Sequence, residues 1–235
     1  MIANNYEKIL DQIAKAAITA GRDPAEVRLV VVTKGHSVEA VKKAVGAGAR
    51  FFGENYLEEA IPKIESLSGV SDIEWHMVGH IQSRKARTVC QYFHRVESLD
   101  GIKLATRLNR FASELKKKIP VLLECNVSGE TSKYGFPAWD EKRWPELLPE
   151  FEMIVDFPAL KVCGLMTMPP YFSNVEDVRP YFQRLVRLRD YLSGEITTFD
   201  LKELSMGMSN DFEIAIQEGA TIVRIGTAIM GKRNS

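Results

Sequence analysis

The sequence predicts an α/β fold, a single (β/α)8 TIM barrel formed by residues 1–235. Three observations support this prediction. Short apolar runs rich in β-branched residues alternate with longer segments of helical periodicity, the pattern of repeated βαβ units and a parallel sheet. The runs number eight, the number that closes into a barrel, and a chain of 235 residues suits one such domain. No low-complexity linker and no shift in composition divides the chain.

The elements follow one another regularly. An amphipathic helix is expected over Asn4–Ala20, and Gly21 is a plausible stop signal. The expected strands are Leu29–Thr33, Arg50–Gly53, Glu74–Gly79, His94–Glu97, Val121–Asn126, Leu160–Met166, Glu203–Ser205 and Ile222–Gly226. The helices expected between them include Val38–Ala47, Tyr56–Leu67, Ser83–Tyr92, Gly101–Lys117, Val175–Leu192 and Asp211–Glu218.

A doubly wound open sheet is the alternative architecture, because the strands at His94 and Glu203 are short and partly polar. Such a sheet normally binds phosphate in a Gly-x-Gly-x-x-Gly turn after its first strand. The segment Val32-Thr33-Lys34-Gly35-His36 has no such turn, which favours the barrel.

Charge and composition exclude several classes of partner. The chain has 31 basic and 31 acidic residues, so we expect no nucleic-acid partner. No stretch reaches the ~18 apolar residues of a membrane span, and the N-terminus lacks a signal pattern, which predicts a cytoplasmic protein. The three cysteines, Cys90, Cys125 and Cys163, are far apart and odd in number, so we expect reduced, buried thiols and no metal site.

Lys34 is the first candidate for chemistry, because the active site of a barrel lies at the carboxyl ends of its strands. It ends the run Leu-Val-Val-Val-Thr, where partial desolvation lowers a lysine pKa. A neutral amine can attack an aldehyde to form an imine. The structural alternative is a lysine that extends from the strand end into solvent.

The last two loops predict a phosphate site, which barrels commonly build after strands seven and eight. Both loops contain a glycine, Gly207 or Gly226, that lets the backbone approach an anion. Hydroxyl donors are available from Ser205, Ser209 and Thr227. Asn210 with Glu213 is expected to cap the helix that follows. Ordinary βα turns, which use the same residue types, are the alternative.

Arg224 is unusual because it lies within the apolar run Ile-Val-x-Ile of the last strand. A buried guanidinium needs a partner. The partner is either a carboxylate or a cofactor ring nitrogen, since pyridoxal 5'-phosphate (PLP) sites use Asp or Arg there. An Arg cannot give up its proton, so it donates to an unprotonated nitrogen and weakens the ring as an electron sink.

The remaining polar candidates are weaker. The four histidines, His36, His76, His80 and His94, have no metal-ligand spacing and are interpreted as core or loop residues. Tyr56 and Met208 are interpreted as packing residues, although either can lie beside a cofactor ring.

Six separated segments together resemble the YggS/PROSC family of PLP-binding proteins. They are VVTKG, FGENYLEEA, WHMVGHIQSRKAR, NVSGETSKYGF, GLMTMPP and LSMGMSNDFEIAIQEGATIVRIGTAIMG, and they span about residues 28 to 231 in the family's order. One departure is Gly35-His36-Ser37 after the lysine, where family members often read Thr-Lys-Pro, which bears on the flexibility of that loop.

The resemblance implies a fold like the N-terminal barrel of alanine racemase and a role in vitamin B6 homeostasis. It implies that Lys34 holds PLP as a Schiff base and that Arg224 faces the pyridine nitrogen. The phosphate cradle it implies consists of Ser205, Gly226 and Thr227, adjoined by Met206 and Ser209, with Asn55 and His80 close to the site.

Three functions remain open. The first is a PLP carrier or buffer, most simply a monomer, that can deliver cofactor to apo-enzymes. The second is a PLP-dependent amino-acid racemase, which needs a base on each face of the substrate. In alanine racemase a second domain and a dimer partner supply the opposing tyrosine, and here Tyr56 and Tyr134 are the only substitutes considered. The third is a sugar-phosphate lyase, whose Schiff-base lysine would be expected on a later strand. The first is favoured.

Overall fold

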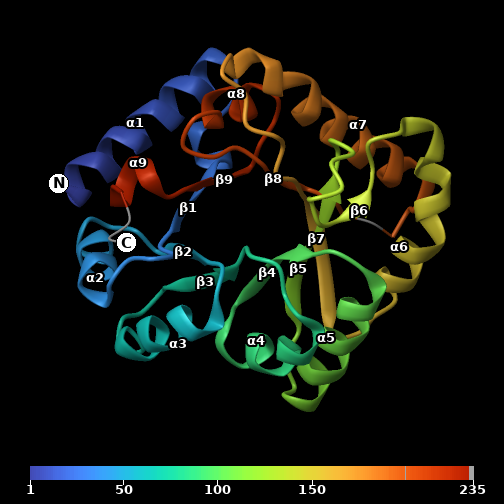
Figure 1. Cartoon of the computed structure of the whole chain (residues 1–235), viewed down its shortest axis with the longest axis horizontal. Helices are drawn as coiled ribbons and strands as arrows, with labels where there is room; N and C mark the ends of the chain where they lie inside the picture. The colour runs from blue at the N-terminus through green and yellow to red at the C-terminus, as the bar shows by residue number, and fades with distance from the viewer. Residues whose placement is uncertain (199, 233–235) are drawn as a thin grey trace.

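Eight parallel strands form a closed barrel in the computed structural model, which describes residues 1–198 and 200–232 (Figure 1). The strands are β1 (Arg28–Val32), β2 (Phe51–Glu54), β3 (Glu74–Met77), β4 (Arg95–Leu99), β5 (Ile119–Asn126), β7 (Leu160–Met166), β8 (Glu203–Ser205) and β9 (Ile222–Ile225). Their order is β4-β3-β2-β1-β9-β8-β7-β5, and a direct β4–β5 pairing closes the ring. This closure confirms the predicted barrel and excludes the open sheet. Residues 199 and 233–235 of the expected domain lie outside the described part.

Helices surround the ring of strands (Figure 1). They are α1 (Ile2–Thr19), α2 (Val38–Gly46), α3 (Leu57–Ser66), α4 (Ala86–Tyr92), α5 (Ile102–Glu114), α6 (Leu148–Val155), α7 (Arg179–Glu195), α8 (Phe212–Gln217) and α9 (Thr227–Met230). Short 3-10 turns occupy Pro24–Glu26, Ser83–Lys85, Glu141–Leu147 and Val175–Val178. None of the described helices is long and apolar enough to cross a membrane.

The first helix ends where the sequence predicted. The Gly21 N–H donates to the Ile18 carbonyl and the Arg22 N–H donates to the Ala17 carbonyl, a pair of bonds that satisfies the last carbonyls of α1. Gly21 has φ +69°, which a residue with a side chain rarely adopts. The Arg22 guanidinium then donates to the Ile216 carbonyl in the last turn of α8 and to the Ala220 carbonyl just after it, so this corner connects the end of α1 to the end of α8.

Alternate side chains of each strand face the helices or the barrel interior. Leu29 and Val31 of β1 belong to the main apolar core, which lies between strands and helices. Val30 between them belongs to a separate small cluster inside the ring. The parallel register places Val30 opposite Arg224, so apolar and charged residues share the interior.

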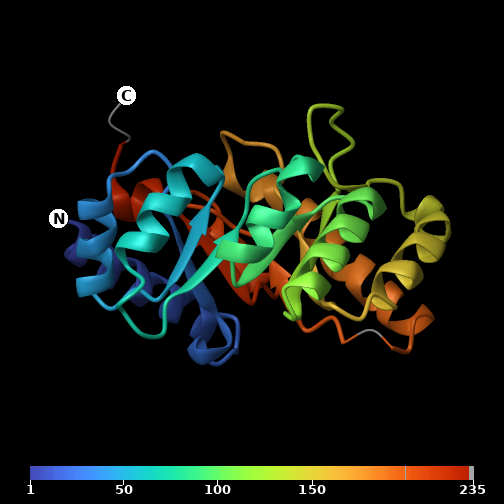
Figure 2. The ribbon, with the colours of Figure 1, turned by 90° about the horizontal axis from the view of Figure 1, so that it is seen from below.

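The structure contains elements that the sequence reading did not include. A two-residue strand, β6 (Phe136–Pro137), pairs with β5 outside the ring, and helix α6 precedes β7. Strand β4 also begins one residue later than predicted and continues to Leu99. In the side view, the segments after β5 and β7 rise on the same side of the barrel, as parallel strands require (Figure 2).

Candidate functional site

Lys34 lies at the corner of a tight turn after β1. The His36 N–H donates to the Thr33 carbonyl at 3.1 Å and closes the turn. Gly35 has φ +74° at the third position, as a type II turn requires. Gly35, which departs from the family pattern, therefore gives this turn its shape.

A cavity of about 410 Å³ opens at the carboxyl ends of the strands. Its apolar walls come from Val32 and Val78 on one side and from the segment 168–172 on another. The predicted site residues that line it are Lys34, Asn55, Ser209, Arg224, Gly226 and Thr227. The fold therefore brings together residues that are up to 193 positions apart (34 to 227) in one pocket.

Two glycines shape the loops after β8 and β9. A side chain at Gly207, which has φ +95°, would place its Cβ 2.6 Å from the Ala215 Cβ. A Cβ at Gly226 would lie 3.2 Å from the Val32 carbonyl oxygen. The Ala228 N–H donates to the Ser209 hydroxyl oxygen at 3.3 Å and joins the two loops. The loops therefore form one surface lined by backbone and hydroxyl groups.

The expected helix cap is corrected by the structure. Helix α8 begins at Phe212 with Asp211 at the N-cap position, and no side chain caps it. The Asp211 carboxylate instead accepts the Met208 N–H at 2.6 Å, two residues before Asn210. This contact keeps Asp211 within the loop, so Asn210 and Glu213 do not form the predicted capping pair. Asn210 is exposed and lines the cavity.

Arg224 forms part of the cavity floor and is only 4% exposed. Its Nη2 donates to the Thr167 carbonyl at 2.8 Å, and its Nη1 donates to the Ser205 hydroxyl. The Glu97 carboxylate lies 3.9 Å from Nη1. Burial lowers the Arg224 pKa, although the surrounding carboxylates oppose that effect. Arginine remains protonated at any ordinary pH, so this floor carries a fixed positive charge.

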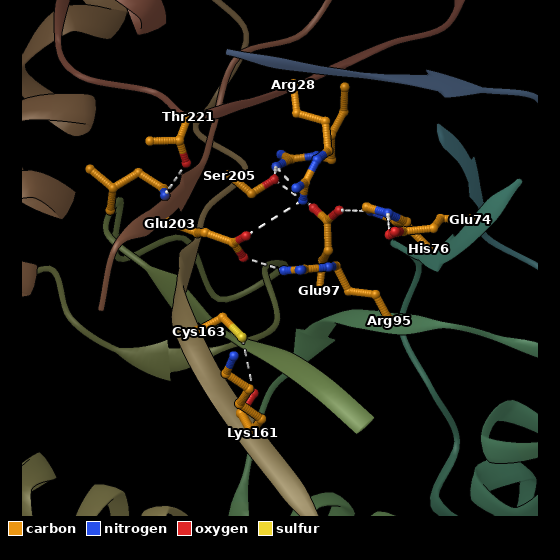
Figure 3. A network of polar contacts seen from close by, with 12 residues as sticks. Arg28, Glu74, His76, Arg95, Glu97, Lys161, Cys163, Glu203, Ser205 and Thr221 are labelled. Carbon is orange, nitrogen blue, oxygen red and sulfur yellow. Dashed lines mark hydrogen bonds and ion pairs between the residues drawn. The ribbon is translucent and has the colours of Figure 1, made fainter. Parts of the chain in front are cut away.

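A buried Glu97–His76 pair lies next to Arg224. Figure 3 shows Glu97 in contact with His76 on one side and Ser205 on the other. The Ser205 hydroxyl donates to Glu97 Oε2 at 2.5 Å, and Glu97 Oε1 lies 2.5 Å from His76 Nδ1. On the other side, His76 Nε2 lies 3.6 Å from Glu74. Burial is the largest single effect on the pKa of each member of the pair, and it opposes ionisation of both. The combined effects of His76, Arg224 and Ser205 outweigh burial and lower the Glu97 pKa to about 2. Glu74 and Glu97 together outweigh burial at His76 and raise its pKa.

A second set of charges continues toward the amino ends of the strands. Glu203 forms an ion pair with Arg95, and its other oxygen lies 3.5 Å from Arg28 (Figure 3). Arg28 also lies over the Phe51 ring at 4.8 Å. Buried and half-buried charges of both signs therefore alternate through the barrel, which limits the cost of placing Arg224 inside it.

Three of the predicted site residues lie outside the cavity lining. Ser205 is fully buried, and its hydroxyl bridges Glu97 and Arg224. Met206 is fully buried in the main apolar core. His80 is exposed, lies 2.8 Å from the Asp100 carboxylate and stacks on Tyr134 at 3.7 Å between ring centroids.

Asn55 and Glu124 carry polar atoms without a hydrogen-bond partner among residues 1–198 and 200–232. These atoms are Asn55 Oδ1 and Glu124 Oε2, both buried. Burial first, and the charge of Asp100 second, raise the Glu124 pKa to about 7. Asn55 lines the cavity and is therefore placed to receive a donor from a bound molecule.

The sequence reading missed Glu97 and assigned His76 no role. The signal that identified Arg224, a charged residue within a buried strand, is also present at Glu97 and Arg95. If this signal is applied to every strand, it predicts charged residues in the barrel interior. It does not predict which of these residues pair with one another.

In the described part of the chain, no group of three or more His, Cys, Asp or Glu residues is placed to hold a metal ion. The three cysteines are buried and unpaired by disulfides. Burial raises the pKa of each thiol, which disfavours the reactive thiolate.

Comparison with known proteins identifies close relatives of the whole chain. Residues 4–234 match the family described as alanine racemase, N-terminal domain. Proteins named pyridoxal phosphate homeostasis protein are 42% identical over 234 residues in Pseudomonas aeruginosa and 41% identical over 227 residues in Aquifex aeolicus. These alignments cover 99% and 96% of this chain, and 96% of each relative.

Solved structures agree with this grouping. PipY of Synechococcus elongatus, solved with PLP bound, is 32% identical with a TM-score of 0.81, over 93% of this chain and 100% of PipY. Alanine racemase of Clostridium difficile is 15% identical with a TM-score of 0.67, over 99% of this chain and 58% of the racemase, which shows a shared fold. The chain therefore belongs to the alanine racemase N-terminal domain family and, within it, to the YggS/PROSC group of pyridoxal phosphate homeostasis proteins.

Proposed function

We propose that this protein binds PLP in the cavity at the barrel mouth and acts in vitamin B6 homeostasis as a carrier or buffer of that cofactor. The observation that carries the proposal is the joint presence of Lys34, Arg224 and two glycine-bearing loops in one cavity of about 410 Å³. The family membership and the PLP bound to PipY support the same ligand.

The residues present fit this cofactor, which supplies an electrophilic aldehyde and an electron-withdrawing ring. Lys34 would hold the cofactor as a Schiff base, in which its neutral amine nitrogen replaces the aldehyde oxygen and that oxygen leaves as water. Ser209, Gly226 and Thr227, which all line the cavity, receive the phosphate. Asn55 Oδ1, which has no hydrogen-bond partner among the residues that the structure describes, accepts a hydrogen bond from the bound molecule.

Arg224 faces the pyridine nitrogen in this proposal. Its Nη1 and Nη2 are already held by Ser205 and Thr167, so the guanidinium is fixed before a ligand arrives. Ser205 accordingly acts through Arg224 rather than as a phosphate ligand. A guanidinium keeps its proton and leaves the ring nitrogen unprotonated, which suits storage of the cofactor better than carbanion chemistry.

The racemase alternative gains no specific support from the residues that line the cavity. Tyr56 and Tyr134, considered as the opposing base, lie outside the lining, and Tyr134 stacks on His80. Tyr171 lines the cavity but is 80% exposed. The proposal also includes a monomeric state, a cytoplasmic location and transfer of PLP to apo-enzymes.

The proposal is tested by titrating the purified protein with PLP and recording the visible absorbance of the imine. Wild type and the control Lys42→Ala, an exposed lysine of α2, are expected to develop the band, whereas Lys34→Ala is not. A wild-type protein whose spectrum in excess PLP equals the sum of free protein and free PLP would remove the cofactor assignment.

Two further assays divide the functional alternatives. Transfer of bound PLP to an apo-enzyme is expected from a carrier, and retention without transfer would leave a buffering role alone. Sustained amino-acid racemisation by the loaded protein would instead favour the enzyme.

A further inference from the structure

One helix holds the backbone on both sides of Lys34. From α3, the Lys63 ammonium donates to the Thr33 carbonyl at 2.8 Å. From the first turn of the same helix, the Glu59 carboxylate accepts the Gly35 N–H at 2.6 Å. The residues immediately before and after Lys34 are therefore tied to the same rigid element.

The Lys63 side chain is itself buried, with 4% of its surface exposed, and it pairs at 2.7 Å with Glu54, whose side chain is fully buried. The Thr33 hydroxyl also donates to this Glu54 oxygen at 2.5 Å. Both groups of the pair thus contact Thr33. A buried ion pair adds little net stability compared with apolar residues of the same size. Its position points to a role in fixing the geometry of the neighbouring turn.

Glu59 is different because 40% of its side chain is exposed, and its carboxylate also lies 3.9 Å from the Lys63 ammonium. Its contact with the Gly35 N–H fixes the corner of the turn at the glycine with φ +74°. A turn held only by its own Thr33–His36 hydrogen bond would sample more backbone states, and each state would move the Lys34 amine relative to the cavity.

We propose that Glu59 and Lys63 are positioning residues that hold the Lys34 turn in the conformation from which its amine reacts. This inference rests on the proposed function, because it concerns the rate at which Lys34 bonds to PLP. Glu59, in the FGENYLEEA segment, and Lys63, further along α3, do not line the cavity, and their role is to position the turn that carries Lys34.

The test is the rate at which the imine band appears after PLP is mixed with wild type, Glu59→Ala, Glu59→Gln and Glu65→Ala. We expect Glu59→Ala to react about tenfold more slowly, because a misplaced reacting group loses rate steeply. Glu59→Gln keeps an acceptor oxygen for the Gly35 N–H and is expected to react within about twofold of wild type. Glu65 lies on the same helix and accepts from the Tyr92 hydroxyl, away from the turn, so Glu65→Ala is the matched control.

A buried structural role alone would change thermal unfolding and leave the imine rate per folded molecule unchanged. We therefore expect Glu59→Ala to unfold at the wild-type temperature and still react slowly. If Glu59→Ala and wild type react at the same rate, the positioning role is refuted. If wild type itself forms no imine, the proposed function fails.

Lys63→Met provides a second measurement of the same role. It leaves Glu54 without its cation, so it is first tested for folding by circular dichroism. If folded, it is expected to react at least about tenfold more slowly, again by misplacing the amine. A folded Lys63→Met protein that reacts at the wild-type rate would contradict the role of Lys63. Because Glu59 lies partly in solvent, its variants decide the proposal even where Lys63→Met does not fold.

Discussion

The buried pair behind Arg224 makes the most quantitative prediction. Folding lowers the pKa of Glu97 from the ordinary 4.5 to about 2. That difference, at about 1.4 kcal/mol per pKa unit, corresponds to about 3 kcal/mol of stabilisation at neutral pH. Because the Glu97 pKa is depressed, its contribution is present above pH 4.5 and is lost as the pH falls through about 2.

The His76 contribution has the opposite sign of pH dependence. Its folded pKa lies above the ordinary 6.5, so the stabilisation is present below pH 6.5 and is lost as the pH rises through the folded value. Both contributions are therefore present near pH 6. At this pH we expect Glu97→Gln to lower the free energy of unfolding by about 3 kcal/mol, the range for breaking a buried ion pair.

A double-mutant cycle measures the pair directly by urea unfolding. We expect Glu97→Gln with His76→Gln to cost at least about 1 kcal/mol less than the sum of the single changes, because the double variant leaves no unpaired charge between them. Glu146→Gln, in an exposed pair with Arg143, is the control and should unfold as wild type does. Additivity within about 0.5 kcal/mol would refute a charged Glu97–His76 pair.

Two other changes test the buried Glu124 carboxyl and the cavity. Glu124→Gln is expected to raise the free energy of unfolding by about 2 kcal/mol more at pH 8 than at pH 5. The reason is that the Glu124 pKa rises to about 7 on folding, so the buried carboxyl destabilises the protein as the pH rises from 4.5. Equal effects of the substitution at both pH values in urea unfolding would contradict this raised pKa. Gly226→Ala is expected to weaken PLP binding about tenfold, because its Cβ would lie 3.2 Å from the Val32 carbonyl oxygen and would displace the loop that receives the phosphate. Gly46→Ala, where a Cβ meets nothing within 4 Å, is the control, and equal PLP affinities in titration would exclude Gly226 from the cradle.

Much of the fold was predictable because its signals are local. Alternating apolar runs and helical segments identified all eight barrel strands, and the short Glu203–Ser205 strand has the bounds that were predicted. Helix α6 was not predicted because prolines, which usually interrupt helices, occur close together at Pro145, Pro149 and Pro158. Pro149 lies in the first turn, where proline is tolerated, so the helix forms.

The site was predictable where position on a strand was enough. Lys34 and Arg224 are conspicuous in the sequence because a charged residue at the end of a buried strand, or within one, is costly unless a partner compensates its charge. The partners of Arg224 were not predictable in the same way. Glu97 lies 108 positions from Ser205, and only closure of the barrel brings their side chains together. For the same reason the sequence did not show that the Ser205 hydroxyl donates to Glu97 inside the barrel.

The central claim is a covalent bond between the Lys34 amine and PLP, and borohydride trapping with peptide mapping tests it most directly. Reduction of the PLP-treated protein followed by proteolysis and mass spectrometry should place the stable adduct on the peptide that contains Lys34. Recovery of that peptide at its unmodified mass, or an adduct confined to other lysines, would contradict the account.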